Sequence, residues 1–311
     1  MAGLFDVAPD AAEETARQFG VRRVFADLES AAGTPDAVFD LAVPGHQILR
    51  TLEALPVGAP VLIQKPMGED LAAARAILQL CQSRRLLAAM NFQLRFSPNM
   101  IALRDLIGRG ALGEVTDIEV RIVVRQPWEN WSFLRGTPRL EVLYHSIHYL
   151  DSIRLIAGEP LGVYCRGVAH PNLPDFRDSR SSIILDYGDR LRCSLMLNHT
   201  HAHDRRHRMS MFKVEGTRGS AVLTMGVNLE YPDGGPDRME VSLDGGPWEE
   251  LALRGSWFTE AFEGPMSNLQ RVVDGEDAAL LSPVADAAKT MALVEACYRS
   301  SATGGTPIEA V

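Results

Sequence analysis

Short apolar runs alternate with helical spacing over the first 92 residues. Runs that suit buried strands lie at 2–5, 37–42, 61–63 and 86–91, with a weaker one near Val24. Between them, residues 9–19, 45–55 and 70–83 space their apolar side chains as helices do. The last of these segments begins at Glu69 and Asp70, and acidic side chains stabilise a helix start. This alternation predicts βαβ units with a parallel sheet.

The pattern changes after Arg95. A helix over 98–109 is expected to end at Gly110, and the following GEVTDIEVRIVV alternates as a strand does. Further predicted strands lie at 162–168, 181–186, 191–198, 209–215, 220–224 and 239–243, and further predicted helices at 141–157 and 283–301. The pattern therefore predicts an α/β domain with a parallel sheet over 1–94, followed by an α+β domain over 95–311 with a mainly antiparallel sheet. The boundary should fall within 91–98.

Charge and cysteine content limit the kinds of partner. The 311 residues carry a net charge of -9, which disfavours a broad surface for nucleic acid. No apolar stretch approaches the roughly 20 residues that span a bilayer. The four cysteines are far apart and form no Cys-x-x-Cys pair, as is typical of reduced thiols. We expect a cytoplasmic protein that has no nucleic-acid or membrane partner.

The segment PVLIQKPMGED carries the strongest chemical signal. Gln64 and Lys65 end an apolar strand, and Pro66 keeps Lys65 extended and ends the strand. Lys65 should therefore project at the carboxyl end of a parallel strand, where open α/β sheets bind ligands. There it could hold a substrate oxygen, and burial would lower its pKa into the range useful for proton transfer. The alternative is a solvated lysine in an ordinary turn.

The segment EVLYHSIHYLDSIRLIAGEP predicts a helix that bears titratable side chains. Tyr144, His148 and Asp151 follow helical spacing and should share one face, with His145 and Ser152 nearby. A histidine beside a phenol and a carboxylate suits proton transfer. Because the helix is otherwise apolar, His148 as a hydrogen-bonded core residue is the alternative.

Two further segments are candidates for binding. In NHTHAHDRRHR, His199, His201 and His203 alternate as on one strand face, but supporting acids are scarce, so we expect a polar loop or strand end and no metal. In RQPWENWSFLRGTPR, Trp128 and Trp131 could line a sugar-binding wall, or this long loop packs on the sheet.

The order of these segments resembles the glucose-fructose oxidoreductase, inositol dehydrogenase and MocA (Gfo/Idh/MocA) family across nearly the whole chain. The matching segments, in order, are FDVAPDAAEETARQFGV, DAVFDLAVPGH, QKPMG, NFQLRFSP, GALGEV, HYLDSIRLIAGEP and MALVEACYRSSATGGTPIEAV. QKPMG resembles the family's Glu-Lys-Pro motif, and DAVFDLAVPGH its strand that leads to an Ala-Thr-Pro turn.

The resemblance implies an N-terminal Rossmann domain and a C-terminal domain with an open antiparallel sheet, which often forms a homo-oligomer interface. It implies oxidation or reduction of a sugar, cyclitol or derivative with NAD, or alternatively NADP. The implied catalytic residues are Lys65, His148 and Tyr144. The implied cofactor-binding residues are Asp6, Val43, Pro44, His46, Gln64 and Lys65, and the implied substrate-binding residues are Lys65, Arg95, Trp128, Trp131, Tyr144, His145 and His148.

Four positions depart from the family pattern. Gln64 stands where glutamate is usual, so a charge beside Lys65 is missing. Tyr144 replaces a common aspartate four residues before the histidine, and Ser146 replaces a glycine. Val43 replaces the threonine of the Ala-Thr-Pro turn.

The beginning of the Rossmann pattern is also absent. No Gly-x-Gly-x-x-Gly turn joins a strand to a helix in this sequence, and the first segments resemble the second strand and helix of the family. Without a first strand, the strands that contain Phe5 and Phe39 either pair with each other or leave a gap. We expect that the start is assigned at an internal methionine, and the alternative is a natural deletion that abolished dinucleotide binding. The alternative function is a non-catalytic sugar-binding or scaffolding relative that has lost dinucleotide binding.

Overall fold

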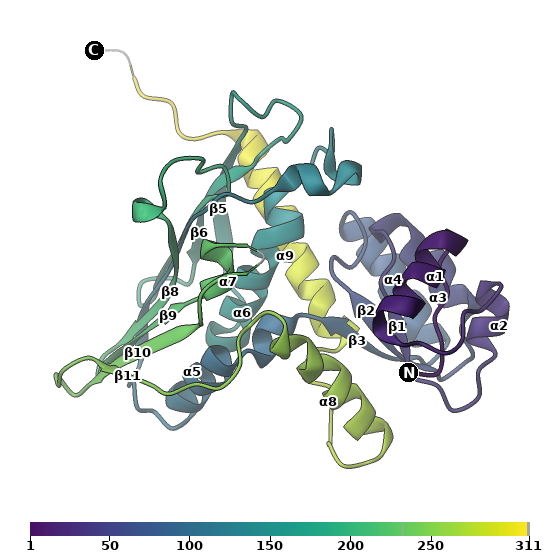
Figure 1. Ribbon diagram of the computed structural model, residues 1–311. Helices are drawn as coiled ribbons and strands as arrows, with labels where there is room; N and C mark the ends of the chain where they lie inside the picture. The colour runs from purple at the N-terminus through teal and green to yellow at the C-terminus, as the bar shows by residue number, and fades with distance from the viewer. Residues whose placement is uncertain (232, 310–311) are drawn as a thin grey trace. The chain divides into compact units, whose positions relative to one another are not determined.

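The computed structural model describes residues 1–231 and 233–309, which form two compact units (Figure 1). The N-terminal unit comprises Met1–Asn91 and Pro265–Ala288, and the C-terminal unit comprises Phe92–Gly264 and Lys289–Val311. This division differs from the single predicted boundary after residue 94, because Pro265–Ala288 joins the N-terminal unit. Each unit has its own sheet.

The N-terminal unit contains the predicted parallel sheet. Its strands β1 (Phe39–Leu41), β2 (Pro60–Gln64) and β3 (Leu87–Asn91) lie in that order, and both pairs are parallel. The strand predicted at 2–5 is wrong: Leu4 makes a single parallel bridge with Val24 instead. Among the described residues β1 pairs with β2 alone, so the segments of Phe5 and Phe39 do not close onto each other.

Local signals set the helix ends of this unit. Pro9 begins α1 (Pro9–Phe19), and Gly20 ends it in the left-handed region at φ 65°. The Asp70 carboxylate accepts the Ala73 N–H at 2.8 Å and caps α4 (Leu71–Ser83). The other helices before β3 are α2 (Leu28–Ala32), which the sequence pattern missed, η1 (Gly45–Gln47) and α3 (Ile48–Ala54).

A helix from late in the chain completes the N-terminal core. Leu269 of α8 (Glu263–Val273) is buried against Leu62 of β2 and Ala89 of β3. The backbone N–H of Met90 donates to the Ser282 carbonyl at 2.8 Å, so the segment after α8 also pairs with β3. These contacts explain why this segment belongs to the N-terminal unit.

The C-terminal unit contains an eight-stranded sheet of order β11-β10-β9-β8-β4-β7-β6-β5. All neighbouring pairs are antiparallel except β4 with β7, which confirms the expected open, mainly antiparallel sheet. The strands are β4 (Val115–Val123), β5 (Gly162–Val168), β6 (Arg180–Asp186), β7 (Arg192–Asn198), β8 (Met209–Gly216), β9 (Gly219–Thr224), β10 (Arg238–Leu243) and β11 (Glu249–Glu250).

Helices α6 (Ile147–Ala157) and α9 (Val284–Thr303) run beside this sheet (Figure 1). Arg154 of α6 donates to the Thr290 hydroxyl of α9 at 2.5 Å, and the Cys165 backbone N–H of β5 donates to the Ser300 hydroxyl of α9 at 2.9 Å. The helix predicted over 141–157 begins with a π-helical segment, η5 (Val142–Ser146), so its side chains depart from regular helical spacing. The remaining helices are η2 (Gln93–Phe96), α5 (Pro98–Gly108), η3 (Trp128–Asn130), η4 (Ser132–Leu134), η6 (Arg205–His207), α7 (Gly226–Leu229) and η7 (Glu260–Phe262).

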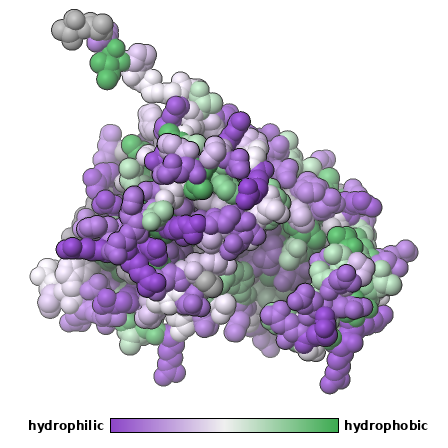
Figure 2. Space-filling view, turned by 45° about the horizontal axis from the view of Figure 1, so that its top comes forward, coloured by the Kyte–Doolittle hydropathy of each residue, from purple (hydrophilic) through white to green (hydrophobic). Residues whose placement is uncertain are grey.

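The one Gly-x-Gly-x-x-Gly spacing in the chain, residues 108–113, connects the end of α5 to β4, which is the reverse of the strand-to-helix order that binds a pyrophosphate. None of the described helices combines the length and apolar character that crossing a bilayer requires. Hydrophilic side chains predominate on the face seen in Figure 2.

Candidate functional site

Lys65 follows the last residue of β2, at the carboxyl end of the parallel sheet. Its side chain is partly buried, and the Lys65–Pro66 peptide is cis. Burial lowers the pKa of Lys65 from 10.5 to about 8. The amine can therefore exist in both protonation states near neutral pH, as a proton-transfer group requires.

The amide of Gln64 connects the three parallel strands. Its Nε2 donates to Asp40 of β1 at 2.8 Å, and its Oε1 accepts from Asn91 of β3 at 2.7 Å. Burial raises the pKa of Asp40, while the hydrogen bond from Gln64 acts in the opposite direction. A glutamate at position 64 would place its carboxylate, which only accepts hydrogen bonds, against the Asp40 carboxylate. This network therefore gives a physical reason for glutamine at position 64.

The turns after β1 and β2 lie against each other. Val43 and Pro44 follow β1, and the His46 Nδ1 lies 3.4 Å from a Glu69 carboxylate oxygen. A Cβ added to Gly45 would lie 3.2 Å from the Gly68 backbone carbon, so this close approach favours glycine. The edge where ligands of parallel sheets bind therefore carries the predicted residues after β1 and β2.

Asp6 precedes α1, where its Oδ1 accepts the Ala8 N–H at 2.8 Å. Asp6 is solvent-exposed, so its carboxylate is open to a ligand's hydroxyl groups. This exposed carboxylate and the turns after β1 and β2 are compatible with a dinucleotide, which Asp6 would hold at a ribose and residues 43–46 and Lys65 at the nicotinamide end.

In the C-terminal unit His148 lies on the first turn of α6 and is buried. The rings of Phe92 and Trp257 meet it edge-on, with centroid distances of 6.3 and 6.0 Å. Sequence reasoning missed Trp257, because it lies more than 100 residues further along the chain and no motif marks it.

Arg95 and Asp151 form a buried ion pair in the C-terminal unit. The Arg95 guanidinium donates to both Asp151 carboxylate oxygens, at 2.6 and 2.5 Å, and both side chains are at most 3% exposed. Thr290 also donates to Asp151. The pair therefore places Arg95, which was expected to bind substrate, in the buried interior of the C-terminal unit.

Tyr144 and the two loop tryptophans form an apolar cluster. Trp128 is buried with Leu134, Leu140 and Phe176, and Tyr144 and Trp131 pack against that core. Tyr144 lies in the π-helical segment, which departs from regular helical spacing, and its ring packs in this cluster. The buried Trp128 is likewise no open sugar-binding wall.

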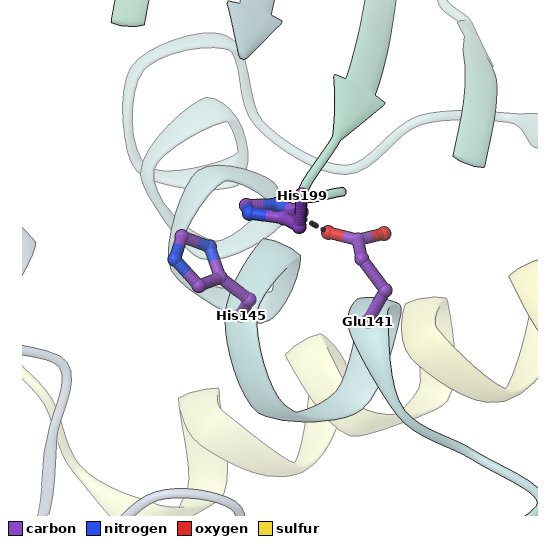
Figure 3. A group of neighbouring side chains, drawn as sticks. All are labelled: Glu141, His145 and His199. Atoms are coloured by element: carbon purple, nitrogen blue, oxygen red, sulfur yellow. Dashed lines mark ion pairs between the residues drawn. The ribbon is translucent and has the colours of Figure 1, made fainter. Parts of the chain in front are cut away.

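His145 lies beside His199 instead, with ring centroids 4.0 Å apart. Glu141 completes this group: one of its oxygens lies 3.1 Å from His199 Nε2 (Figure 3). Of the histidine-rich segment, only His199 enters this group; His201 and His203 lie on the surface. Sequence reasoning missed Glu141, although its four-residue spacing from His145 was a usable signal.

Two family models match the chain. The model described as "Oxidoreductase family, NAD-binding Rossmann fold" matches residues 1–92, and that of the GFO/IDH/MocA C-terminal domain matches residues 100–222. Together they cover the N-terminal sheet and much of the C-terminal sheet.

Similar proteins of known activity include sugar and cyclitol dehydrogenases. D-apiose dehydrogenase of Rhizobium rhizogenes is 25% identical over 98% of this chain and 89% of its own length. Inositol 2-dehydrogenase of Leifsonia xyli is 33% identical over 50% of this chain and 45% of its own length.

Solved structures share the fold. An oxidoreductase from Agrobacterium radiobacter, in complex with NAD+, L-tartaric acid and magnesium, has a TM-score of 0.81 at 21% identity, over 98% of this chain and 89% of its own. Aldose-aldose oxidoreductase from Caulobacter crescentus, complexed with glycerol, has a TM-score of 0.78 at 18% identity, over 98% and 90%. With the two domain models in their expected order, the chain belongs to the Gfo/Idh/MocA family of oxidoreductases, whose N-terminal domain has the NAD-binding Rossmann fold.

Proposed function

We propose that the chain is an NAD-dependent dehydrogenase that transfers hydride between nicotinamide and a secondary alcohol or carbonyl carbon of a sugar, cyclitol or derivative. NADP is the alternative cofactor. The relatives named above act on apiose and inositol, which supports a polyhydroxylated substrate. The observation that carries the proposal is the Lys65 amine at the carboxyl end of β2, with its pKa lowered to about 8.

In this proposal Lys65 exchanges the hydroxyl proton of the substrate. During alcohol oxidation the neutral amine accepts that proton, and during carbonyl reduction the ammonium returns it. When bound, the nicotinamide supplies the acceptor or donor of the hydride. His148 is proposed to hold a substrate oxygen, and its burial between Phe92 and Trp257 keeps the imidazole in one position.

A non-catalytic sugar-binding relative is the second candidate. It is favoured by Tyr144, whose ring packs in the apolar cluster around Trp128 and so does not replace the usual carboxylate. NADH fluorescence separates the two candidates, because only the dehydrogenase requires saturable dinucleotide binding. Saturation by NADH, followed by sugar- or cyclitol-dependent absorbance at the NADH band, supports the dehydrogenase, and the absence of both supports the non-catalytic relative.

We further propose that the C-terminal sheet forms a homo-oligomer. Its outer face exposes Tyr164, Ile184 and Met196, which are 65%, 53% and 52% accessible. Tyr164 and Ile184 are directly paired across β5 and β6, so the apolar side chains are neighbours. Such a patch on a soluble domain commonly marks an interface.

A further inference from the structure

We propose that Glu141, His145 and His199 bind a divalent transition-metal ion of the zinc class. Glu141 immediately precedes η5, His145 lies within it, and His199 directly follows β7. Their potential ligand atoms all lie within 4.8 Å of one another. Figure 3 shows the two imidazoles and the carboxylate gathered at the end of the strand. All three residues belong to the C-terminal unit, so the site needs no other part of the chain.

The burial of this group requires compensation for its polar atoms. Glu141 and His199 are both 0% exposed, and burying a carboxylate without partners is costly. The hydroxyls of Ser146 and Ser181 donate one to each carboxylate oxygen of Glu141. These bonds orient the carboxylate as supporting groups orient a metal ligand, and they leave further lone pairs on both oxygens.

His199 provides the second, independent observation. Within the described residues, its buried Nδ1 has no hydrogen-bond partner, and its Nε2 has the 3.1 Å ion-pair contact with Glu141 and no assigned hydrogen bond. A buried imidazole without hydrogen bonds is unusual in a folded protein. Coordination of a metal ion by one ring nitrogen of His199 would give that nitrogen a partner. Metal ions bind the neutral form of imidazole.

The donor set selects the class of ion. Two imidazoles with one carboxylate suit zinc and similar transition metals, whereas magnesium and calcium prefer oxygen ligands alone. With bonds of about 2.1 Å, tetrahedral ligand atoms lie about 3.4 Å apart. The 3.1 Å between the Glu141 oxygen and His199 Nε2 is near this value, and the ligand atom of His145 lies within 4.8 Å of the other two.

The surroundings are also those of a metal site. Trp128 meets His145 and His199 edge-on, at centroid distances of 6.3 and 5.8 Å, and shields both rings. The π-helical segment that holds His145 is an irregularity that occurs frequently at functional sites. His145 is only half-buried, so the ligand set is not sealed from solvent on that side.

Zinc titration of the full chain tests the proposal. The protein is treated with a chelator and exchanged into chelator-free buffer, and Zn²⁺ is then added while bound metal is measured per chain. We expect one Zn²⁺ per chain. Glu141→Gln, His145→Gln and His199→Gln should each abolish stoichiometric binding, and Ser181→Ala should weaken it about 10-fold.

A double variant, His201→Ala with His203→Ala, is the matched control. The ring centroids of His201 and His203 lie 5.5 Å apart, so these two imidazoles could bind zinc adventitiously. Retention of one Zn²⁺ per chain by the control supports the proposed site, and its loss there assigns the metal to the surface pair and overturns the proposal. The absence of binding in the natural sequence overturns it as well.

Cobalt keeps the test valid if a buried variant misfolds. His145 is only half-buried, so His145→Gln should fold, and circular dichroism verifies this. Co²⁺ in a site with His145 as a ligand gives visible absorption that His145→Gln removes. An unchanged Co²⁺ spectrum in that folded variant contradicts the proposal. Neither the zinc titration nor the cobalt spectrum requires NAD or turnover. Failure of the metal-site proposal can therefore be distinguished from failure of the proposed dehydrogenase activity.

Discussion

Gln64 uses both ends of its amide, because its Nε2 donates to Asp40 and its Oε1 accepts from Asn91. The substitution Gln64→Glu removes the donor and places a carboxylate against Asp40. We expect the free energy of unfolding to fall by about 0.5–1.5 kcal/mol at pH 7, as urea denaturation would measure. Adding Asp40→Asn should restore much of the loss, because the new amide donates to Glu at position 64. A loss that persists in the double variant contradicts this account.

Asp178 gives the clearest pH dependence at the residue scale. Burial raises its pKa from 3.8 to about 6, although the Leu140 N–H acts in the opposite direction. Between about pH 4 and pH 6 the folded chain therefore binds more protons than the unfolded chain, and the contribution of Asp178 to stability falls as pH rises. The stability of Asp178→Asn relative to the natural sequence should therefore increase from about pH 4 to pH 6. Above that interval the gain should stay constant, at roughly 1–3 kcal/mol at pH 7. A difference that does not vary with pH would refute the assignment.

At the scale of elements, α8 has a testable role in the N-terminal unit. Leu269 is fully buried against β2 and β3, so Leu269→Ala should lower the free energy of unfolding by about 2–5 kcal/mol. Val273 on the same helix is 46% exposed, and Val273→Ala should change stability by less than about 0.5 kcal/mol. Equal losses in the two variants would show that α8 is not a core helix.

Elements with local signals could be predicted from the sequence, and those that depend on distant contacts could not. Pro9 and Gly20 fix the ends of α1, and alternation in 115–123 identifies β4. By contrast, α8 is held by Leu62 and Ala89, which lie far away in the sequence. The sequence pattern also predicted a regular helix around Tyr144, where the structure has a π-helical segment.

The same distinction applies to the candidate sites. The position of Lys65 follows from a strand and the proline after it, which are adjacent in sequence. The pairing of Glu141 with His199 depends on β7 ending beside the π-helical segment, and no local pattern encodes that. Arg95 resembled a ligand-binding residue in its motif because its buried partner Asp151 is distant in sequence.

At the scale of the whole molecule, self-association through the C-terminal sheet is open to direct measurement. Met196→Glu places a charge in the exposed apolar face and should convert an oligomer to a monomer in light scattering after size-exclusion chromatography. Ile101 is 51% exposed on α5, outside this sheet, so Ile101→Glu is the control and should leave the mass unchanged. A natural chain that is already monomeric, or an oligomer that persists in Met196→Glu, contradicts this interface.

The central claim is that Lys65 exchanges a proton during hydride transfer. The measurement is kcat/KM for NAD-linked oxidation of a sugar or cyclitol substrate by Lys65→Ala, with Lys289→Ala as the surface control, whose lysine pairs with Glu159. We expect Lys65→Ala to lose about 10²–10⁴-fold while it remains folded and binds NADH, and the control to retain full activity. In the natural sequence, kcat/KM for alcohol oxidation should increase as the pH rises through about 8, because Lys65 then loses its proton. Activity of a folded Lys65→Ala within about twofold of the natural chain would contradict the account.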